Sequence, residues 1–203
     1  MIDRSFDPLN TAIKGAIMGN SIDFMIHDQL QKVESLIREK LQEPLSETAY
    51  AGFIEKLRHT NNLVYFCDNC GEIVFDRLLM ETMKEQYPGL SIVAVVRSEA
   101  TLNDATLKDA ASIGLDKIAK VEGNGIDGPL PGTVFERCSA DIKNLVAQAD
   151  LIISKGGGNF ETIQEQIPKL EADITFLLLS KCNPHMMELG VSRYQPILFN
   201  IFH

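Results

Sequence analysis

Residues 63–76, LVYFCDNCGEIVFD, join a predicted strand to a predicted helix and hold the most chemically distinctive side chains of the chain. LVYFC is rich in β-branched and aromatic residues, which is typical of a strand. From residue 71 to residue 86 apolar residues recur at helical spacing, so a helix follows. At the junction Cys67 and Cys70 stand in C-x-x-C spacing with an Asp-Asn pair between them. The stretch therefore allows either a dithiol site or a carboxylate site.

The same strand–helix alternation continues to the C-terminus. SIVAVVR is continuously apolar, as expected of a strand buried on both faces. The segment KIAKVEGNGIDGPLPG, residues 117–132, is turn-rich and is assigned no strand. The alternation predicts an α/β fold with a mainly parallel, Rossmann-like sheet flanked by helices. Further strands are expected at SIVAVVR, DLIISKG, DITFLLLSK and PILFNIF, and further helices at about residues 105–112, 134–149 and 159–166.

The first 60 residues show only helical patterns. A helix is expected to begin at Asp7-Pro8, because proline suits the first turn. Two more helical runs cover about residues 28–42 and 46–58, and no strand is expected among them. We therefore predict an N-terminal helical segment, residues 1–60, and an α/β domain, residues 61–203.

Composition narrows the class of protein. Hydrophobic residues make up 45% and charged residues 23% of the 203 positions, which is ordinary for a soluble globular protein. The net charge of -9 disfavours nucleic acid as a partner. The apolar runs are too short to span a membrane, and the N-terminus shows no apolar signal region. Four cysteines do not form a disulfide scaffold at this length. We expect a reduced, cytoplasmic protein.

Polar residues follow the predicted strands, at the edge where open α/β sheets bind ligands. Carboxylate and amide oxygens suit Mg²⁺ or Mn²⁺. A glycine run that opens a helix can present free backbone N–H groups to an anion, and a lysine adds positive charge. These features predict a phosphate site with a hard metal. In chain order the residues are Asp68, Asn69 and Glu72, then Arg97 and Asp104, then Lys155, Gly156, Gly157, Gly158 and Asn159, and finally Lys181.

Each of these features also has a purely structural interpretation. Asp68 and Asp104 could cap helices, and the glycine run could be a tight turn that binds nothing. The C-x-x-C spacing could mark a thioredoxin-like dithiol. However, Asp68 between the thiols opposes thiolate formation, so we interpret Cys67 and Cys70 as packing residues.

Several ordered blocks together resemble one family. They are MGNSIDF (18–24), YFCDNCGE (65–72), VVRSEATLNDAT (95–106), ADLIISKGGGNFE (149–161) and LLLSKC (177–182). This combination resembles the damage-control metal-dependent phosphatase family, also known as the domain of unknown function eighty-nine, in its compact archaeal and bacterial form. Two features depart from the family pattern. The chain begins almost at its D-P-L block, and Ser98-Glu99-Ala100 replaces a proline-containing turn after Arg97.

The resemblance implies one divalent cation, Mg²⁺ or Mn²⁺ with Co²⁺ and Ni²⁺ as further candidates, bound by Asp68, Asn69 and Asp104. It also implies that Lys155 contacts phosphate and that Asn20 and Asp23 lie near the substrate. The implied substrate is a small phosphorylated metabolite, such as a sugar phosphate or a damaged phosphometabolite.

The function predicted is therefore metal-dependent hydrolysis of phosphate monoesters. The expected catalytic residues are Asp68, Asn69, Asp104 and Lys155, with water favoured over Asp68 as the attacking group. Two alternatives stay open at this point. One is a non-catalytic module that binds a phosphometabolite or nucleotide, and the other is a dithiol oxidoreductase. The oligomeric state is left open.

Overall fold

The computed structural model describes residues 6–25, 38–39, 41–180, 187 and 190–203, with only the backbone for residues 21–25. Lys181 and most of the helix expected at about 28–42 lie outside the described residues. None of the helices in the described ranges is long and apolar enough to cross a membrane.

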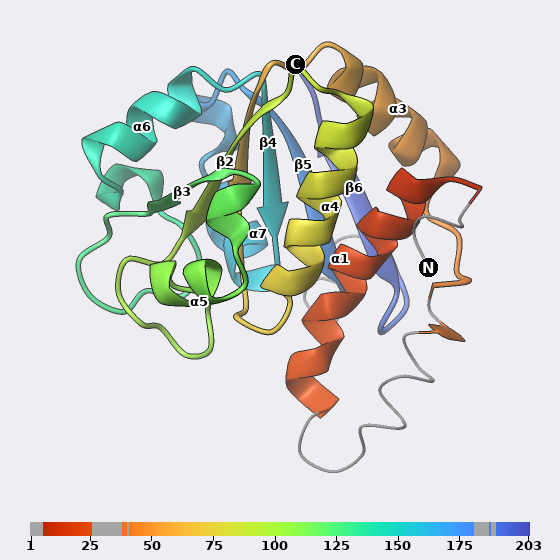
Figure 1. Cartoon of the computed structure of the whole chain (residues 1–203), viewed down its shortest axis with the longest axis horizontal. Coiled ribbons are helices and arrows are strands. Elements are labelled where there is room, and N and C mark those ends of the chain that lie inside the picture. Colours follow the sequence, from red (N-terminus) through yellow and green to blue (C-terminus); the bar gives the residue numbers. More distant parts are fainter. Residues whose placement is uncertain (1–5, 26–37, 40, 181–186, 188–189) are drawn as a thin grey trace.

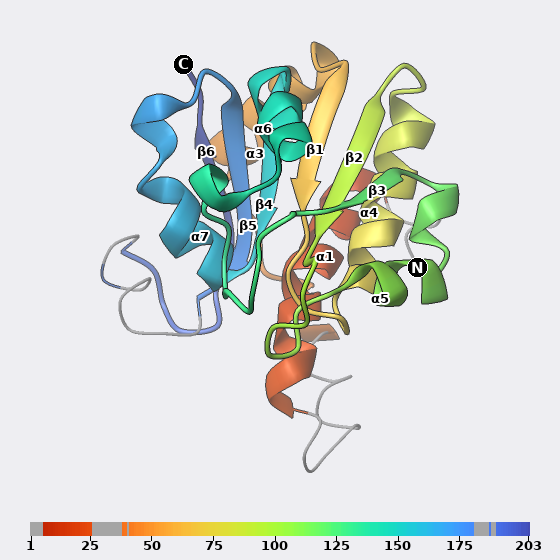
Figure 2. The same cartoon turned by 90° about the vertical axis from the view of Figure 1, so that its left-hand side faces the viewer.

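A single six-stranded sheet in the order β3-β2-β1-β4-β5-β6 forms the centre of the fold (Figures 1 and 2). β1 to β5 run parallel, and β6 is antiparallel to β5. Chain order reverses beside β1, whose neighbours are β2 and β4, and such switch points are where open α/β sheets bind ligands. The strands are β1 (Asn62–Phe66), β2 (Ser91–Val96), β3 (Lys120–Gly123), β4 (Leu151–Lys155), β5 (Asp173–Leu179) and β6 (Pro196–Ile201).

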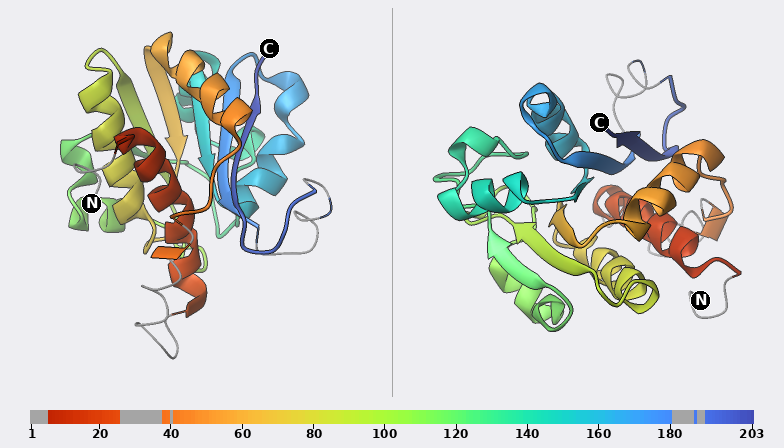
Figure 3. Two further views of the ribbon diagram at one scale, coloured as in Figure 1. Left: turned by 90° about the vertical axis from the view of Figure 1, so that its right-hand side faces the viewer. Right: turned by 90° about the horizontal axis from the view of Figure 1, so that it is seen from above.

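Helices cover both faces of the sheet, as the right-hand view of Figure 3 shows. Successive strand residues point to opposite faces, so the sheet separates two apolar cores. Tyr65 faces the core shared with α1, α3, α4 and α5, whereas Phe66 faces the core shared with α6 and α7. The helices are α1 (Pro8–Met25), α3 (Glu47–Arg58), α4 (Ile73–Gln86), α5 (Leu107–Ser112), α6 (Ala140–Ala147) and α7 (Gly157–Gln164).

The expected fold class is confirmed, and three details of the prediction were wrong. β3 lies inside the segment interpreted as turns, because a four-residue edge strand without a buried residue carries no apolar signature. The helix expected at 134–149 is divided into a 3-10 helix, Phe135–Arg137, and α6. The division falls at Ser139, whose Oγ accepts a hydrogen bond from the Ile142 backbone N–H at 3.3 Å and caps α6. α7 begins at Gly157, earlier than residue 159.

Candidate active site

The carboxyl ends of β1, β2 and β4 bring most of the predicted site residues together. Asp68 and Asn69 follow β1, and Asp104 lies in the loop after β2. The two loops are joined by an antiparallel bridge between Asn69 and Asp104, and the Ala105 N–H donates to the Asp68 carbonyl at 2.7 Å. Backbone pairing therefore fixes two carboxylates and an amide at one point of the sheet edge.

Gly156 lets Asp68 lie directly against the start of α7. Its φ of +77° falls in the region that favours glycine, and an added Cβ would stand only 1.9 Å from Asp68 Oδ2. The first N–H groups of a helix have no partner within the helix, so the start of α7 carries partial positive charge beside this carboxylate. Glycine is therefore required at position 156 both by the backbone conformation and by the close approach of Asp68.

Two amides hold Asp68 and Glu72 together. Asn69 Nδ2 donates to Asp68 Oδ2 at 3.1 Å and to Glu72 Oε2 at 3.0 Å. Asn20 Nδ2 donates to the same two oxygens. Asn20 reaches them because Gly19 allows close approach of α1 and α4, where an added Cβ would lie 2.9 Å from Glu72 Cβ.

Lys155 binds the other carboxylate oxygen of Glu72 and belongs to a fully buried cluster of charges. Its Nζ donates to Glu72 Oε1 at 2.7 Å, Asp76 Oδ1 at 2.6 Å and the Ala16 carbonyl at 2.9 Å. Burial alone would lower the pKa of Lys155, but Asp76 and Glu72 outweigh burial and raise it. Asp76 also accepts a hydrogen bond from the Tyr65 hydroxyl at 2.7 Å. The sequence interpretation missed Asp76, although its position one helical turn after Glu72 could have indicated it.

Arg97 connects Asp104 to the start of α7. Its Nε donates to Asp104 Oδ2 at 2.6 Å, and its other nitrogens donate to the Gly132 carbonyl, to Thr133 Oγ1 at 3.0 Å and to Asn159 Oδ1 at 3.1 Å. The side chain is only 4% exposed. Arg97 is thus a buried partner that holds the Asp104 carboxylate in place. The sequence did not indicate Thr133, since nothing in a turn-rich segment marks it as a partner of Arg97.

The site concentrates negative charge around Asp68. Burial, followed by the carboxylates of Glu72 and Asp104, raises the pKa of Asp68 well above its usual range. A divalent cation would relieve this repulsion, and the oxygen-rich side chains fit a hard metal ion. Among the residues that the structure describes, no three His, Cys, Asp or Glu side chains form a metal-binding group. The candidate ligand set instead combines Asp68 and Asp104 with the amide of Asn69.

The remaining predicted residues are placed less completely. The backbone of Asp23 lies in α1, less than one turn beyond Asn20, but its side chain is outside the described residues.

Cys67 is buried and Cys70 is exposed. Burial, followed by the charge of Asp76, raises the pKa of the Cys67 thiol well above its usual range. A buried, strongly protonated thiol is unsuited to dithiol exchange, which disfavours the oxidoreductase alternative.

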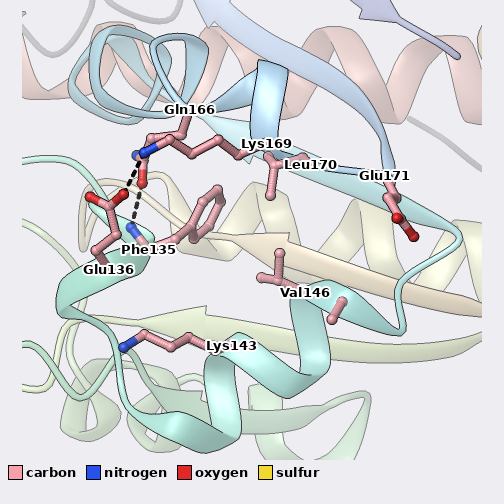
Figure 4. Close-up of a pocket in the computed structure, with 9 residues that line it drawn as sticks. Phe135, Glu136, Lys143, Val146, Gln166, Lys169, Leu170 and Glu171 are labelled. Carbon is pink, nitrogen blue, oxygen red and sulfur yellow. Dashed lines mark hydrogen bonds and ion pairs between the residues drawn. The ribbon is translucent and has the colours of Figure 1, made fainter.

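A separate cavity of about 440 Å³ lies on the face of the sheet covered by α6 and α7 (Figure 4). Phe135, Val146 and Leu170 give it apolar walls, and an exposed ion pair between Lys169 and Glu136 stands at its edge. None of the predicted site residues lines this cavity. We therefore assign the chemistry to the sheet edge and not to the cavity.

Comparisons with known proteins agree with the fold and the blocks of sequence. The family described as the damage-control phosphatase ARMT1-like domain matches residues 1–197. The chain is 38% identical over 191 residues to an uncharacterised protein of Methanocaldococcus jannaschii, covering 93% of this chain and 62% of that protein. It is 32% identical over 194 residues to a damage-control phosphatase of Archaeoglobus fulgidus, covering 95% and 65%.

Structural similarity points the same way. The crystal structure of a DUF89 family protein from Pyrococcus horikoshii has a TM-score of 0.80 and 30% sequence identity, covering 93% of this chain and 64% of that chain. The chain spans slightly less than two-thirds of the length of these relatives. On both sequence and structure, the chain belongs to the damage-control phosphatase family with an ARMT1-like domain.

Proposed function

We propose that this protein is a metal-dependent phosphatase that hydrolyses phosphate monoesters of small cytoplasmic metabolites, such as sugar phosphates or damaged phosphometabolites. The observation that carries the proposal is the meeting of Asp68, Asn69 and Asp104 beside the start of α7. Family relatives named as damage-control phosphatases support the reaction class.

In this proposal Asp68, Asn69 and Asp104 hold one divalent cation, with Mg²⁺ and Mn²⁺ preferred. A cation bound there would neutralise phosphoryl oxygens and favour ionisation of an attacking water. Asp68 Oδ2 already accepts hydrogen bonds from two amides. We therefore favour water over the Asp68 carboxylate as the attacking group.

The phosphoryl group is proposed to lie on the N–H groups at the start of α7, from Gly157 to Asn159. These donors have no intrahelical partner and stand at the positive end of the helix dipole. Asn159 contributes only its backbone there, because its side chain binds Arg97, Thr133 and the carbonyls of Cys67 and Lys155.

A panel assay tests the proposal directly. The purified protein is incubated with p-nitrophenyl phosphate and with sugar phosphates, each in the presence of EDTA, Mg²⁺, Mn²⁺, Co²⁺ or Ni²⁺. We expect turnover that requires a divalent ion, and a loss of about a hundredfold or more in Asp68→Asn and Asp104→Asn, because each variant removes a charged ligand.

Asp150→Asn is the matched control. Asp150 accepts hydrogen bonds from the Asn61 and Asn62 N–H groups before and at the start of β1, at the opposite end of the sheet. Metal-dependent turnover of Asp68→Asn equal to that of Asp150→Asn would reject the proposal. Stabilisation by metal and phosphate without any turnover would instead support the non-catalytic binding module.

A further inference from the structure

Both site amides are held in one orientation by the same two carboxylate oxygens. Asn69 Nδ2 and Asn20 Nδ2 each donate to Asp68 Oδ2 and Glu72 Oε2, so both hydrogens of each amide are used. If either amide turned over, its carbonyl oxygen would face two carboxylates. The oxygen of each amide is therefore directed away from the two accepting oxygens, Asp68 Oδ2 and Glu72 Oε2. For Asn69, that oxygen is the atom that the proposed function needs as a ligand.

Glu72 makes these contacts from a fully buried position beside a positive charge. Its Oε1 accepts from Lys155 at 2.7 Å, and both side chains are 0% exposed. An ammonium group has three N–H donors, and Lys155 gives them to Glu72, Asp76 and the Ala16 carbonyl. No donor of Lys155 is left for a phosphate in this arrangement.

We propose that Glu72 is a positioning residue that sets the orientation of the Asn69 and Asn20 amides, and that Lys155 acts through Glu72 as its buried counter-charge. This inference rests on the proposed function, because the oriented Asn69 oxygen is taken to be a cation ligand. The family resemblance implies direct contact between Lys155 and phosphate. Here Lys155 acts on the site indirectly, through Glu72. Residues that orient metal ligands typically change metal affinity by about ten- to a hundredfold when they are altered.

Glu72→Gln is the informative substitution because it keeps the shape of the side chain. Lys155 would take the glutamine oxygen, which leaves the glutamine NH₂ group facing the N–H groups of Asn69 and Asn20. Donors would then oppose donors on the side of residue 72, while Asp68 Oδ2 would still require a donor. Neither orientation of the two amides would satisfy both neighbours, so their fixed orientation would be lost. Calorimetric titration of Mn²⁺ into the metal-free protein measures the effect. We expect the dissociation constant of Glu72→Gln to be about ten- to a hundredfold higher than that of the wild type.

Asp76→Asn is the matched control. It removes one negative charge from the same cluster and contacts the same lysine. Asp76, however, accepts hydrogen bonds from Lys155 and Tyr65 and not from either amide. We expect its Mn²⁺ dissociation constant to change less than about threefold, compared with the rise of about ten- to a hundredfold expected for Glu72→Gln. An equal loss in both variants would show that only charge matters and would overturn the inference. So would an unchanged affinity in Glu72→Gln.

A second measurement needs neither the variants nor a metal. In ¹H–¹⁵N spectra of the metal-free wild-type protein, the side-chain NH₂ protons of Asn69 and Asn20 should exchange with water much more slowly than those of the exposed Asn61. Exchange as fast as that of Asn61 would overturn the inference even if Glu72→Gln failed to fold. Absence of Mn²⁺ binding by the wild type, with slow exchange retained, would reject the proposed function and keep the amide orientation.

Discussion

Replacement of Gly156 by alanine should damage both the stability and the chemistry of the protein. Gly156 has φ +77° and ψ 164°, a region that is essentially restricted to glycine. An alanine Cβ would also lie 1.9 Å from Asp68 Oδ2 and 2.2 Å from Asp68 Cγ. Such distances are impossible, so the Asp68 carboxylate must move away from the start of α7.

The cost can be worked from these contacts. The backbone conformation costs about 1–3 kcal/mol for a residue with a side chain. Moving Asp68 weakens charge-assisted hydrogen bonds from Asn20 and Asn69, each contributing about 1.5–3 kcal/mol. With partial relaxation we expect a loss of about 3–5 kcal/mol in the free energy of unfolding. At about 2–4 °C per kcal/mol for a domain of this size, Tm falls by about 6–20 °C.

Urea unfolding and metal-dependent phosphatase assays measure the two effects. Gly158→Ala is the stability control, because its Cβ would meet the Gly132 backbone no closer than 3.4 Å. Gly52→Ala in α3 is the activity control, since its nearest contact is Asn200 at 3.5 Å. Both controls should stay within about 1 kcal/mol of the wild type. A Gly156→Ala protein within 1 kcal/mol of the wild type, with full activity, would refute the close approach of Asp68.

Three further outcomes are expected. Arg97→Lys keeps the charge but not the fork that reaches several acceptors, so urea unfolding should show a loss of about 3 kcal/mol, and a loss below 1 kcal/mol would contradict this. Burial raises the pKa of Asp76 to about 6, and removing its cation in Lys155→Met should raise that pKa further. A folded-state pKa above the unfolded value stabilises at low pH and loses that stabilisation as pH rises. Lowering the pH from 8 to 5 should therefore change Tm more favourably in Lys155→Met than in the wild type. An equal change of Tm in both proteins would count against this prediction. At pH 8 iodoacetamide should modify Cys70 in the native protein and Cys67 only after unfolding, as followed by peptide mass spectrometry, and native labelling of Cys67 would contradict its burial.

Local sequence was sufficient for the strand–helix pattern and for the position of the site along the chain. β1, β2, β4 and β5 are short apolar runs. Asp68 and Asp104 follow β1 and β2, and Lys155 is the last residue of β4. Since the carboxyl ends of parallel strands meet at one edge, the gathering of these residues could be predicted without coordinates. β3 could not, because an edge strand with exposed or half-buried residues has no distinctive period.

The partners of the charged side chains were decided by the tertiary structure. Lys155 was expected to face a phosphate, whereas its Nζ binds Glu72, which is 83 residues away in sequence, and Asp76. Arg97 similarly binds two protein side chains, those of Asp104 and Asn159. The sequence determined which residues reach the sheet edge because strand and helix periodicity are local properties. Which atoms meet there depended on how α1, α4 and α7 pack, since hydrogen bonds of about 3 Å require positions that only the folded chain supplies.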